Sequence, residues 1–224
     1  MRRARLRALA AALTFLGPVR AQAAGWYIGG EAGWIALADE PARAMIPVIG
    51  QRNDRERWSD GYDFGARAGY GWDNWRLEEE FRFQRNGAAT FAGAAATGNG
   101  TAYALMTDLL YELPRIGVFA PHLGAGVGAV TVRESIATAG FSSGVATGSD
   151  TGFGYQAIGG FDVMLSPSVA VDLDYRYLAA APLRFRTPSG FVESGHPAGN
   201  LPVASGYRTY SLVASVIYRF GSAP

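Results

Sequence analysis

Charged side chains recur at every second position of the segment VDLDYRYLA, residues 171–179. Asp172, Asp174 and Arg176 alternate there with valine, leucine and tyrosine. Because successive side chains of a β-strand point to opposite faces, one face of this segment is wholly charged and the other wholly apolar. Such a face can form an ion-pair network, a metal site or an acid–base pair, depending on what lies opposite it.

The same alternation places further charges on the same side of other segments. The full set is Glu31, Arg67, Glu78, Glu80, Arg82, Asp108, Asp162, Asp172, Asp174, Arg176 and Arg219. Buried charges must be paired, and this mixture of carboxylates and guanidiniums can be cross-linked by bidentate pairs. We therefore expect a structural charge network; the alternative is a polar conduit or a gate made of switchable salt bridges.

Residues for catalysis or metal binding are scarce. The chain has no Cys, and its two histidines, His122 and His196, lie in no recognisable cluster with a serine and an acid. The same two-residue alternation places His122 on the charged face, whereas His196 falls in a predicted loop. The glycine run GAGVGA lacks the lysine and the helix of a phosphate loop. We predict no catalytic residue, no metal ligand and no cofactor, and hence no enzyme.

The N-terminus resembles an export signal. Four arginines precede an apolar run at residues 8–16, and the small-residue site Ala21-Gln22-Ala23 follows. We predict that residues 1–23 are a cleaved secretory signal peptide. Cleavage would remove five arginines and leave 15 basic against 19 acidic residues, a net charge of −4. The mature chain therefore has no basic footprint for nucleic acid.

Alternating segments fill the rest of the chain, and their connections differ in length. Short turns are expected at Asp73-Asn74, Pro114 to Gly117 and Ser166 to Ser168, and long loops at 38–60, 86–100, 133–151 and 179–206. Eight strands are predicted, at about 26–37, 61–72, 75–85, 101–112, 118–132, 152–165, 169–178 and 207–220. Most have the length of a tilted strand that crosses a membrane.

Aromatic residues decide which face is inside. The apolar faces collect them near the strand ends, at Trp26, Trp34, Tyr62, Tyr70, Trp72, Trp75, Tyr111, Tyr175, Tyr177, Tyr210, Tyr218 and Phe220. Aromatic girdles of this kind are typical of membrane proteins, so the charged face is predicted to point inward and the apolar face to lipid. An open sheet edge would leave backbone polar groups unpaired in lipid, which costs free energy. The strands must therefore pair all the way round into a closed barrel. The predicted fold is an all-β, eight-stranded antiparallel up-and-down transmembrane barrel over residues 24–220, followed by a short extension at 221–224. An eight-stranded lumen is just wide enough for side chains, so we expect a packed polar interior.

Two features do not follow from this pattern alone. Glu79 falls on the lipid-facing side, which requires either a bulge nearby or a position close to the membrane interface. The fourth long loop carries Leu183, Phe185, Phe191 and Val192, which form either a partner-binding patch or contacts with neighbouring loops. Loops 38–60 and 179–206 are the candidate surfaces for an external ligand.

Five stretches resemble the small eight-stranded outer-membrane barrels that include the OmpA-type transmembrane domain and the opacity-type porins. They are GWYIGGEAGW, WRLEEEFRF, PHLGAGVGAV, GYQAIGGFDVMLSPSVAVDLDYRYL and YSLVASVIYRF. The resemblance covers the mature chain and implies a location in the outer membrane of a Gram-negative bacterium, in contact with its lipid. It also implies insertion by the barrel-assembly machinery. Members commonly end on an aromatic residue, whereas GSAP follows Phe220 here.

Three functions are compatible with these patterns. The first is a structural barrel whose loops form a surface-interaction, adhesion-like module. The second is a narrow ion or small-solute pore, controlled by Arg67, Glu80 or Asp172. The third is a lipid-modifying outer-membrane enzyme, for which the sequence offers no convergent triad. We expect any role in the envelope to come from the barrel or its loops.

Overall fold

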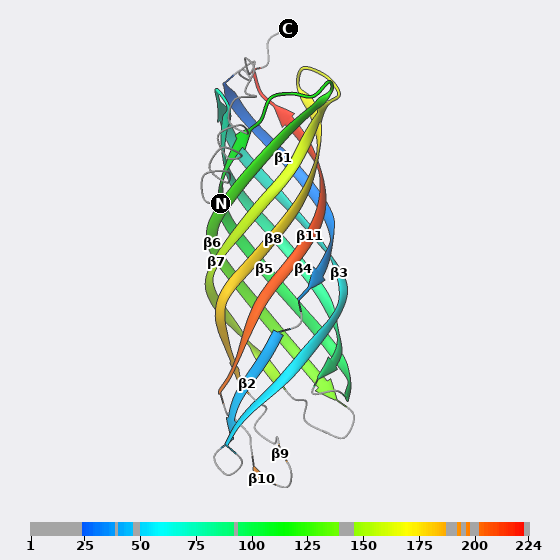
Figure 1. Ribbon diagram of the computed structural model, residues 1–224, viewed down its shortest axis with the longest axis vertical. Coiled ribbons are helices and arrows are strands. Elements are labelled where there is room, and N and C mark those ends of the chain that lie inside the picture. Colours follow the sequence, from blue (N-terminus) through cyan, green and yellow to red (C-terminus); the bar gives the residue numbers. More distant parts are fainter. Residues whose placement is uncertain are drawn as a thin grey trace, which may run out of the picture.

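A closed antiparallel barrel accounts for almost all of the computed structural model (Figure 1). The structure describes residues 24–38, 40–46, 50–91, 94–138, 146–186, 192–193, 196–197 and 202–221. The predicted signal peptide lies outside these residues, as do residues 222–224 of the C-terminal extension. No helix in the described residues is long and apolar enough to cross a membrane.

Eight long strands form the barrel wall, and each pairs with its neighbours in antiparallel register. They are β1 (Gly25–Leu37), β3 (Gly50–Trp72), β4 (Trp75–Phe91), β5 (Ala94–Glu112), β6 (Phe119–Thr138), β7 (Ala146–Met164), β8 (Val169–Arg186) and β11 (Pro202–Arg219). β1 pairs with both β3 and β11, and β11 also pairs with β8, which closes the sheet. The predicted fold class is therefore confirmed.

Tight turns join strands at one end of the barrel. Asp73 has a φ of 49° in the turn between β3 and β4, a conformation that Asp tolerates because its side chain can bond the local backbone. Gly117, with a φ of 64°, lies in the turn between β5 and β6. Between β7 and β8, the Ser166 hydroxyl accepts a hydrogen bond from the Val169 amide at 3.0 Å. All three turns lie where the sequence predicts them.

Strand pairing continues much further than predicted at the opposite end, which we call the hairpin end. Large parts of the predicted loops 38–60, 86–100, 133–151 and 179–206 belong to strands, including β2 (Glu40–Ile46), which pairs with β3 and β11 (Figure 1). Two short strands, β9 (Val192–Glu193) and β10 (His196–Pro197), pair with each other. The apolar alternation stops where one face no longer meets lipid, but backbone pairing needs no such alternation.

Candidate functional site

The barrel interior contains the eleven charged residues that the alternation along the strands predicts. Ten of the eleven residues are buried, and Arg219 is partly buried, with 14% of its side chain exposed. They project from β1, β3, β4, β5, β7, β8 and β11 toward the barrel axis. The interior is thus the place where charged side chains from the whole sequence come together.

Arg67 of β3 connects four strands near the middle of the barrel. Its Nη2 lies 2.9 Å from Glu31 Oε2 on β1 and 3.3 Å from Asp174 Oδ2 on β8. Its Nη1 lies 3.5 Å from Glu78 Oε2 on β4, and a further contact is with Asp172. A guanidinium offers five donors in a planar fork, which allows one side chain to satisfy carboxylates from several directions.

Arg176 of β8 reaches the opposite wall of the barrel. It pairs with Glu80 of β4, and three strands separate β4 from β8 in either direction around the wall. It also lies 3.2 Å from Glu31 Oε2 and 2.7 Å from Asp174 Oδ2. The pair of Arg176 and Glu80 therefore spans the barrel diameter.

A second group of charges lies toward the tight turns. Arg76 Nη1 is 3.2 Å from Asp162 Oδ2, and Arg219 Nη2 is 3.0 Å from the same oxygen. The Tyr27 hydroxyl donates a 2.6 Å hydrogen bond to Glu78 Oε1. These contacts join β1, β4, β7 and β11, so the network extends along the axis as well as across it.

Toward the hairpin end the network changes from ion pairs to neutral hydrogen bonds. Arg82 Nη2 lies 2.6 Å from Asp63 Oδ2. One level further, the Tyr207 hydroxyl donates to Gln84 Oε1 at 2.9 Å. Beside and beyond these residues the described interior is mixed, because buried Asn86, Glu134 and Ser205 accompany an apolar cluster of Ala102, Ala104, Met106, Val130, Val132, Leu178, Leu183, Phe185 and Tyr207. The expected polar interior thus holds for the middle of the barrel, whereas the interior toward the hairpin end combines this apolar cluster with a few buried polar residues.

The apolar interior cluster corrects one sequence prediction. Leu183 and Phe185 were expected in an exposed loop, but they are 1% and 3% exposed. Ser205 pairs with Leu183, whereas Tyr207 pairs with Ala180, so β8 carries one extra residue at this point. Such a bulge shifts the face to which later side chains point, and it turns both residues inward. Phe191 lies outside the described residues, and the structure describes no side chain for Val192.

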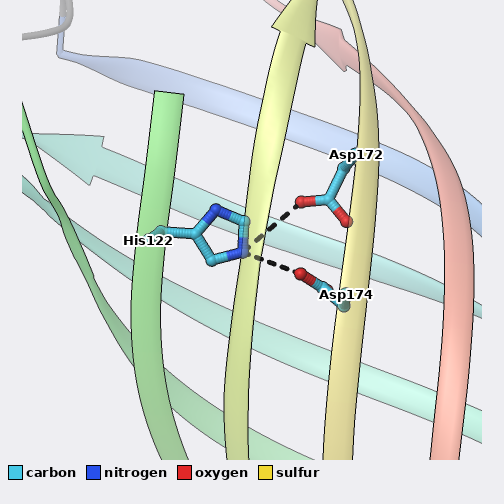
Figure 2. A group of neighbouring side chains, drawn as sticks. All are labelled: His122, Asp172 and Asp174. Atoms are coloured by element: carbon cyan, nitrogen blue, oxygen red, sulfur yellow. Dashed lines mark hydrogen bonds and ion pairs between the residues drawn. The ribbon is translucent and has the colours of Figure 1, made fainter. Parts of the chain in front are cut away.

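His122 of β6 faces two carboxylates of β8 (Figure 2). Its Nε2 is 2.7 Å from Asp174 Oδ1 and 3.7 Å from Asp172 Oδ2. One nitrogen and two carboxylate oxygens lie within 4.8 Å of one another, a donor set that a transition metal can use. Arg67 and Arg176 bind the same carboxylates, however, so the geometry is that of a hydrogen-bonded histidine inside the charge network.

Carboxyl groups outnumber guanidinium groups in the described interior. Ten buried acidic residues face four buried arginines and the partly buried Arg219. Four buried charged residues are absent from the predicted set, namely Asp63, Arg76, Glu112 and Glu134. The first three share its alternation along β3, β4 and β5, whereas Glu134 lies in β6 beyond the predicted strand 118–132.

The outer surface carries aromatic residues in two belts. The turn-end belt contains Trp26, Tyr70, Trp72, Trp75, Tyr111, Tyr218 and Phe220, with Trp75 and Tyr111 ring centroids 4.8 Å apart. The hairpin-end belt contains Trp34, Tyr62, Phe83, Tyr103, Tyr175, Tyr177 and Tyr210, with Phe83 and Tyr103 centroids 5.4 Å apart. All twelve aromatic residues singled out from the sequence point outward into one of these belts.

Glu79 lies midway between the two belts, and this position contradicts both explanations offered from sequence. The register around it is regular, with Ala68 opposite on β3 and Thr107 opposite on β5. It is four residues from Trp75 and four from Phe83, so it is far from either belt. Its Oε1 accepts a 2.7 Å hydrogen bond from the Thr107 hydroxyl, which satisfies one carboxyl oxygen on an apolar surface.

Comparison with known proteins supports the architecture. A family model described as outer membrane protein beta-barrel domain matches residues 8–220. No curated protein matches the sequence.

Solved structures of outer-membrane proteins resemble the whole barrel. The outer membrane protein OprG from Pseudomonas aeruginosa is 18% identical with a TM-score of 0.67, and the alignment covers 89% of this chain and 99% of OprG. Neisserial surface protein A is 18% identical with a TM-score of 0.51, covering 88% of this chain and 97% of that one. The outer membrane protease OmpT from Escherichia coli is 9% identical with a TM-score of 0.51, covering 87% and 97%.

These identities are low, so the structural likeness establishes the fold and nothing about activity. The family match covers nearly the whole chain, and the closed eight-stranded wall agrees with it. This chain therefore belongs to the outer membrane protein β-barrel family.

Proposed function

We propose that this protein is a closed outer-membrane barrel that acts as a structural scaffold and displays its hairpin end for interaction with external partners. The observation that carries the proposal is the filled interior. Arg176 and Glu80 pair across the barrel diameter, and the apolar cluster around Phe185 packs the hairpin half. A solute would have to break both arrangements to pass.

The aromatic belts support placement in the membrane. Trp26 and Trp34 mark the two belts on β1. They are eight residues apart on a strand that is inclined to the barrel axis (Figure 1). At a rise of about 3.3 Å per residue and a tilt of about 45°, the belts are roughly 20 Å apart along the axis. This spacing approaches the apolar band of about 25 Å that outer-membrane barrels present to lipid. We expect contact with outer-membrane lipid there, and insertion by the barrel-assembly machinery.

The hairpin end provides the surface for interaction. Beyond the hairpin-end belt β8 continues for nine residues, β11 for eight and β3 for twelve, which adds roughly 20–30 Å at the same rise and tilt. In barrels of this class the longer connections face the outside of the cell. The described residues of the regions 38–60 and 179–206, proposed above as ligand surfaces, belong largely to this projecting part.

A narrow cation pore is the second candidate. The observation that favours it is the excess of ten buried carboxyl groups over five arginines, because uncompensated carboxylates attract cations. In that case Asp172 and Glu80 would be the residues that control passage. Neither candidate function involves an enzymatic step. Overexpression should leave the mass of lipid A unchanged, and a new lipid A species would point to enzymatic activity instead.

Single-channel recording separates the two candidates. The refolded mature chain is inserted into a planar bilayer, and strand content and insertion are verified on the same preparation. We expect a silent bilayer, because the interior is closed. Reproducible conductance steps that change in the Asp172→Asn variant, but not in the surface variant Arg184→Gln, would contradict the scaffold function and support the pore function.

A further inference from the structure

A row of three polar residues crosses the outer surface just beyond the hairpin-end belt. Arg85 of β4 pairs with Thr101 of β5, and Thr101 pairs with Arg133 of β6. Directly paired residues point to the same face of a sheet, and both arginines are exposed. With neighbouring strands about 4.8 Å apart, the two arginine Cα atoms lie roughly 10 Å from each other with Thr101 between them.

Neither guanidinium in this row forms an ion pair with a described residue. In the part of the chain that the structure describes, no carboxylate pairs with Arg85 or Arg133. The side-chain contact of Arg133 is with the face of the Tyr103 ring, 5.5 Å from the ring centroid. By contrast, Arg67, Arg76, Arg82, Arg176 and Arg219 of the interior each contact at least one carboxylate.

The row lies at the level where lipid headgroups begin. Arg85 is two residues beyond Phe83, and Thr101 is two residues from Tyr103, so both follow directly on belt residues of the same face. The contact with Tyr103 keeps the Arg133 guanidinium against the belt. Beside it, the hydroxyls of Thr131 and Thr151 are hydrogen-bonded at 2.8 Å and add further polar groups. Aromatic belts mark the membrane interface, and basic residues next to them meet the headgroups.

We propose that Arg85, Thr101 and Arg133 bind the phosphate of an anionic lipid in the leaflet at the hairpin end. Guanidinium groups bind phosphate oxygens through paired hydrogen bonds, and two of them on either side of a hydroxyl can hold one phosphate group between them. The acyl chains of the same lipid then lie along Tyr103 and Leu105, which face outward below the row. This inference rests on the membrane placement proposed above and not on the closed interior.

Native mass spectrometry of the refolded barrel in a neutral detergent tests the site. The probe is bisphosphorylated lipid A, added in increasing amounts to the wild type and to the Arg85→Gln/Arg133→Gln variant. We expect the double variant to bind at least tenfold more weakly. Arg184→Gln is the matched control, because Arg184 is also an exposed arginine at the hairpin end but lies outside the row.

Three results would overturn the proposal. They are equal binding by the double variant, an equal loss in Arg184→Gln, and undiminished binding of lipid A from which both phosphates have been removed. Saturation by inorganic phosphate alone, at the affinity of the lipid, would overturn the assignment to a lipid. Strand content measured on each preparation shows whether a variant has folded, and insertion into vesicles tests the membrane placement separately.

Discussion

Among single residues, the interior arginines determine most of the site's chemistry. Each contacts carboxylates from strands far apart in the sequence, and Arg176 alone contacts Glu31, Glu80 and Asp174. Burial of these groups is tolerable only while they remain paired, since an isolated charge inside a protein carries a large desolvation penalty. Loss of one arginine therefore affects several carboxylates at once.

The Arg176→Ala variant should be much less stable than the wild type. It leaves three buried carboxylates without their shared partner, for which we expect a loss of about 3–5 kcal/mol in the free energy of unfolding. Urea titration of the refolded barrel in lipid vesicles measures this loss. Arg184→Ala removes an exposed arginine of the same strand and should change stability by no more than ~0.5 kcal/mol. Equal effects of the two variants would contradict the network.

Glycines on the inner face make room for charged neighbours. A Cβ at Gly160 would lie 2.1 Å from Asp174 Oδ1 and 2.4 Å from the Leu173 carbonyl oxygen, so Gly160→Ala must displace the strand or the carboxylate. We expect a loss of about 1–3 kcal/mol in the same titration. Gly30 lies on the outer face, where a Cβ would meet nothing within 4 Å, so Gly30→Ala should be close to neutral. A neutral Gly160→Ala would mean that the packing around Asp174 is loose.

At the scale of secondary-structure elements, the strands consist of two parts. Between the belts, apolar and polar residues alternate strictly, as in the β1 segment from Trp26 to Trp34. Beyond the hairpin-end belt the strands remain paired without that pattern, and β2 joins the sheet. The tight turns at the other end have no comparable extension, so the two ends of the barrel meet different surroundings.

Epitope tags should show this asymmetry in intact cells. A tag inserted between β4 and β5, after Phe91, should be labelled by antibody without permeabilisation. A tag between Asp73 and Asn74 should be labelled only after the outer membrane is opened, because that turn lies at the opposite end. The reverse pattern would show that the barrel has the opposite orientation in the membrane. Labelling of both tags in intact cells would argue against a barrel that spans the membrane.

In the whole molecule, two closures lie in series along the axis. The ion pairs around Arg176 close the middle, and the apolar cluster around Phe185 closes the hairpin half. The proposed scaffold function requires that either closure alone blocks passage, so opening one of them should have no effect on conductance. This arrangement distinguishes a scaffold from a channel with a single gate.

Conductance of combined variants tests the arrangement in series. Glu80→Ala/Arg176→Ala removes both partners of the pair across the diameter, and we expect it to remain silent in a planar bilayer. Adding Met106→Ala and Phe185→Ala to these changes should give conductance steps, because both closures are then reduced. Steps in the first variant alone would show that the ion pairs are the only barrier.

The sequence by itself determined the architecture. An alternation of period two, aromatic residues at the ends of apolar faces and turn formers at short connections are local properties, so strand number, inner and outer faces and the tight turns could be predicted from it. The same parity identified the buried charges. Asp63, Arg76 and Glu112 share this alternation within the predicted strands, whereas Glu134 lies in a part of β6 that the sequence predicts as a loop.

Only the tertiary structure decided which charges meet and where the interior is closed. Partners such as Arg176 and Glu80 depend on closure and on the stagger between strands, which no local pattern contains. The inward position of Leu183 and Phe185 depends on one extra residue in β8, and the partner of Glu79 depends on the register of β4 with β5. Side-chain direction along a strand is set by the neighbouring residues, whereas contacts across a barrel are set by the path of the whole sheet.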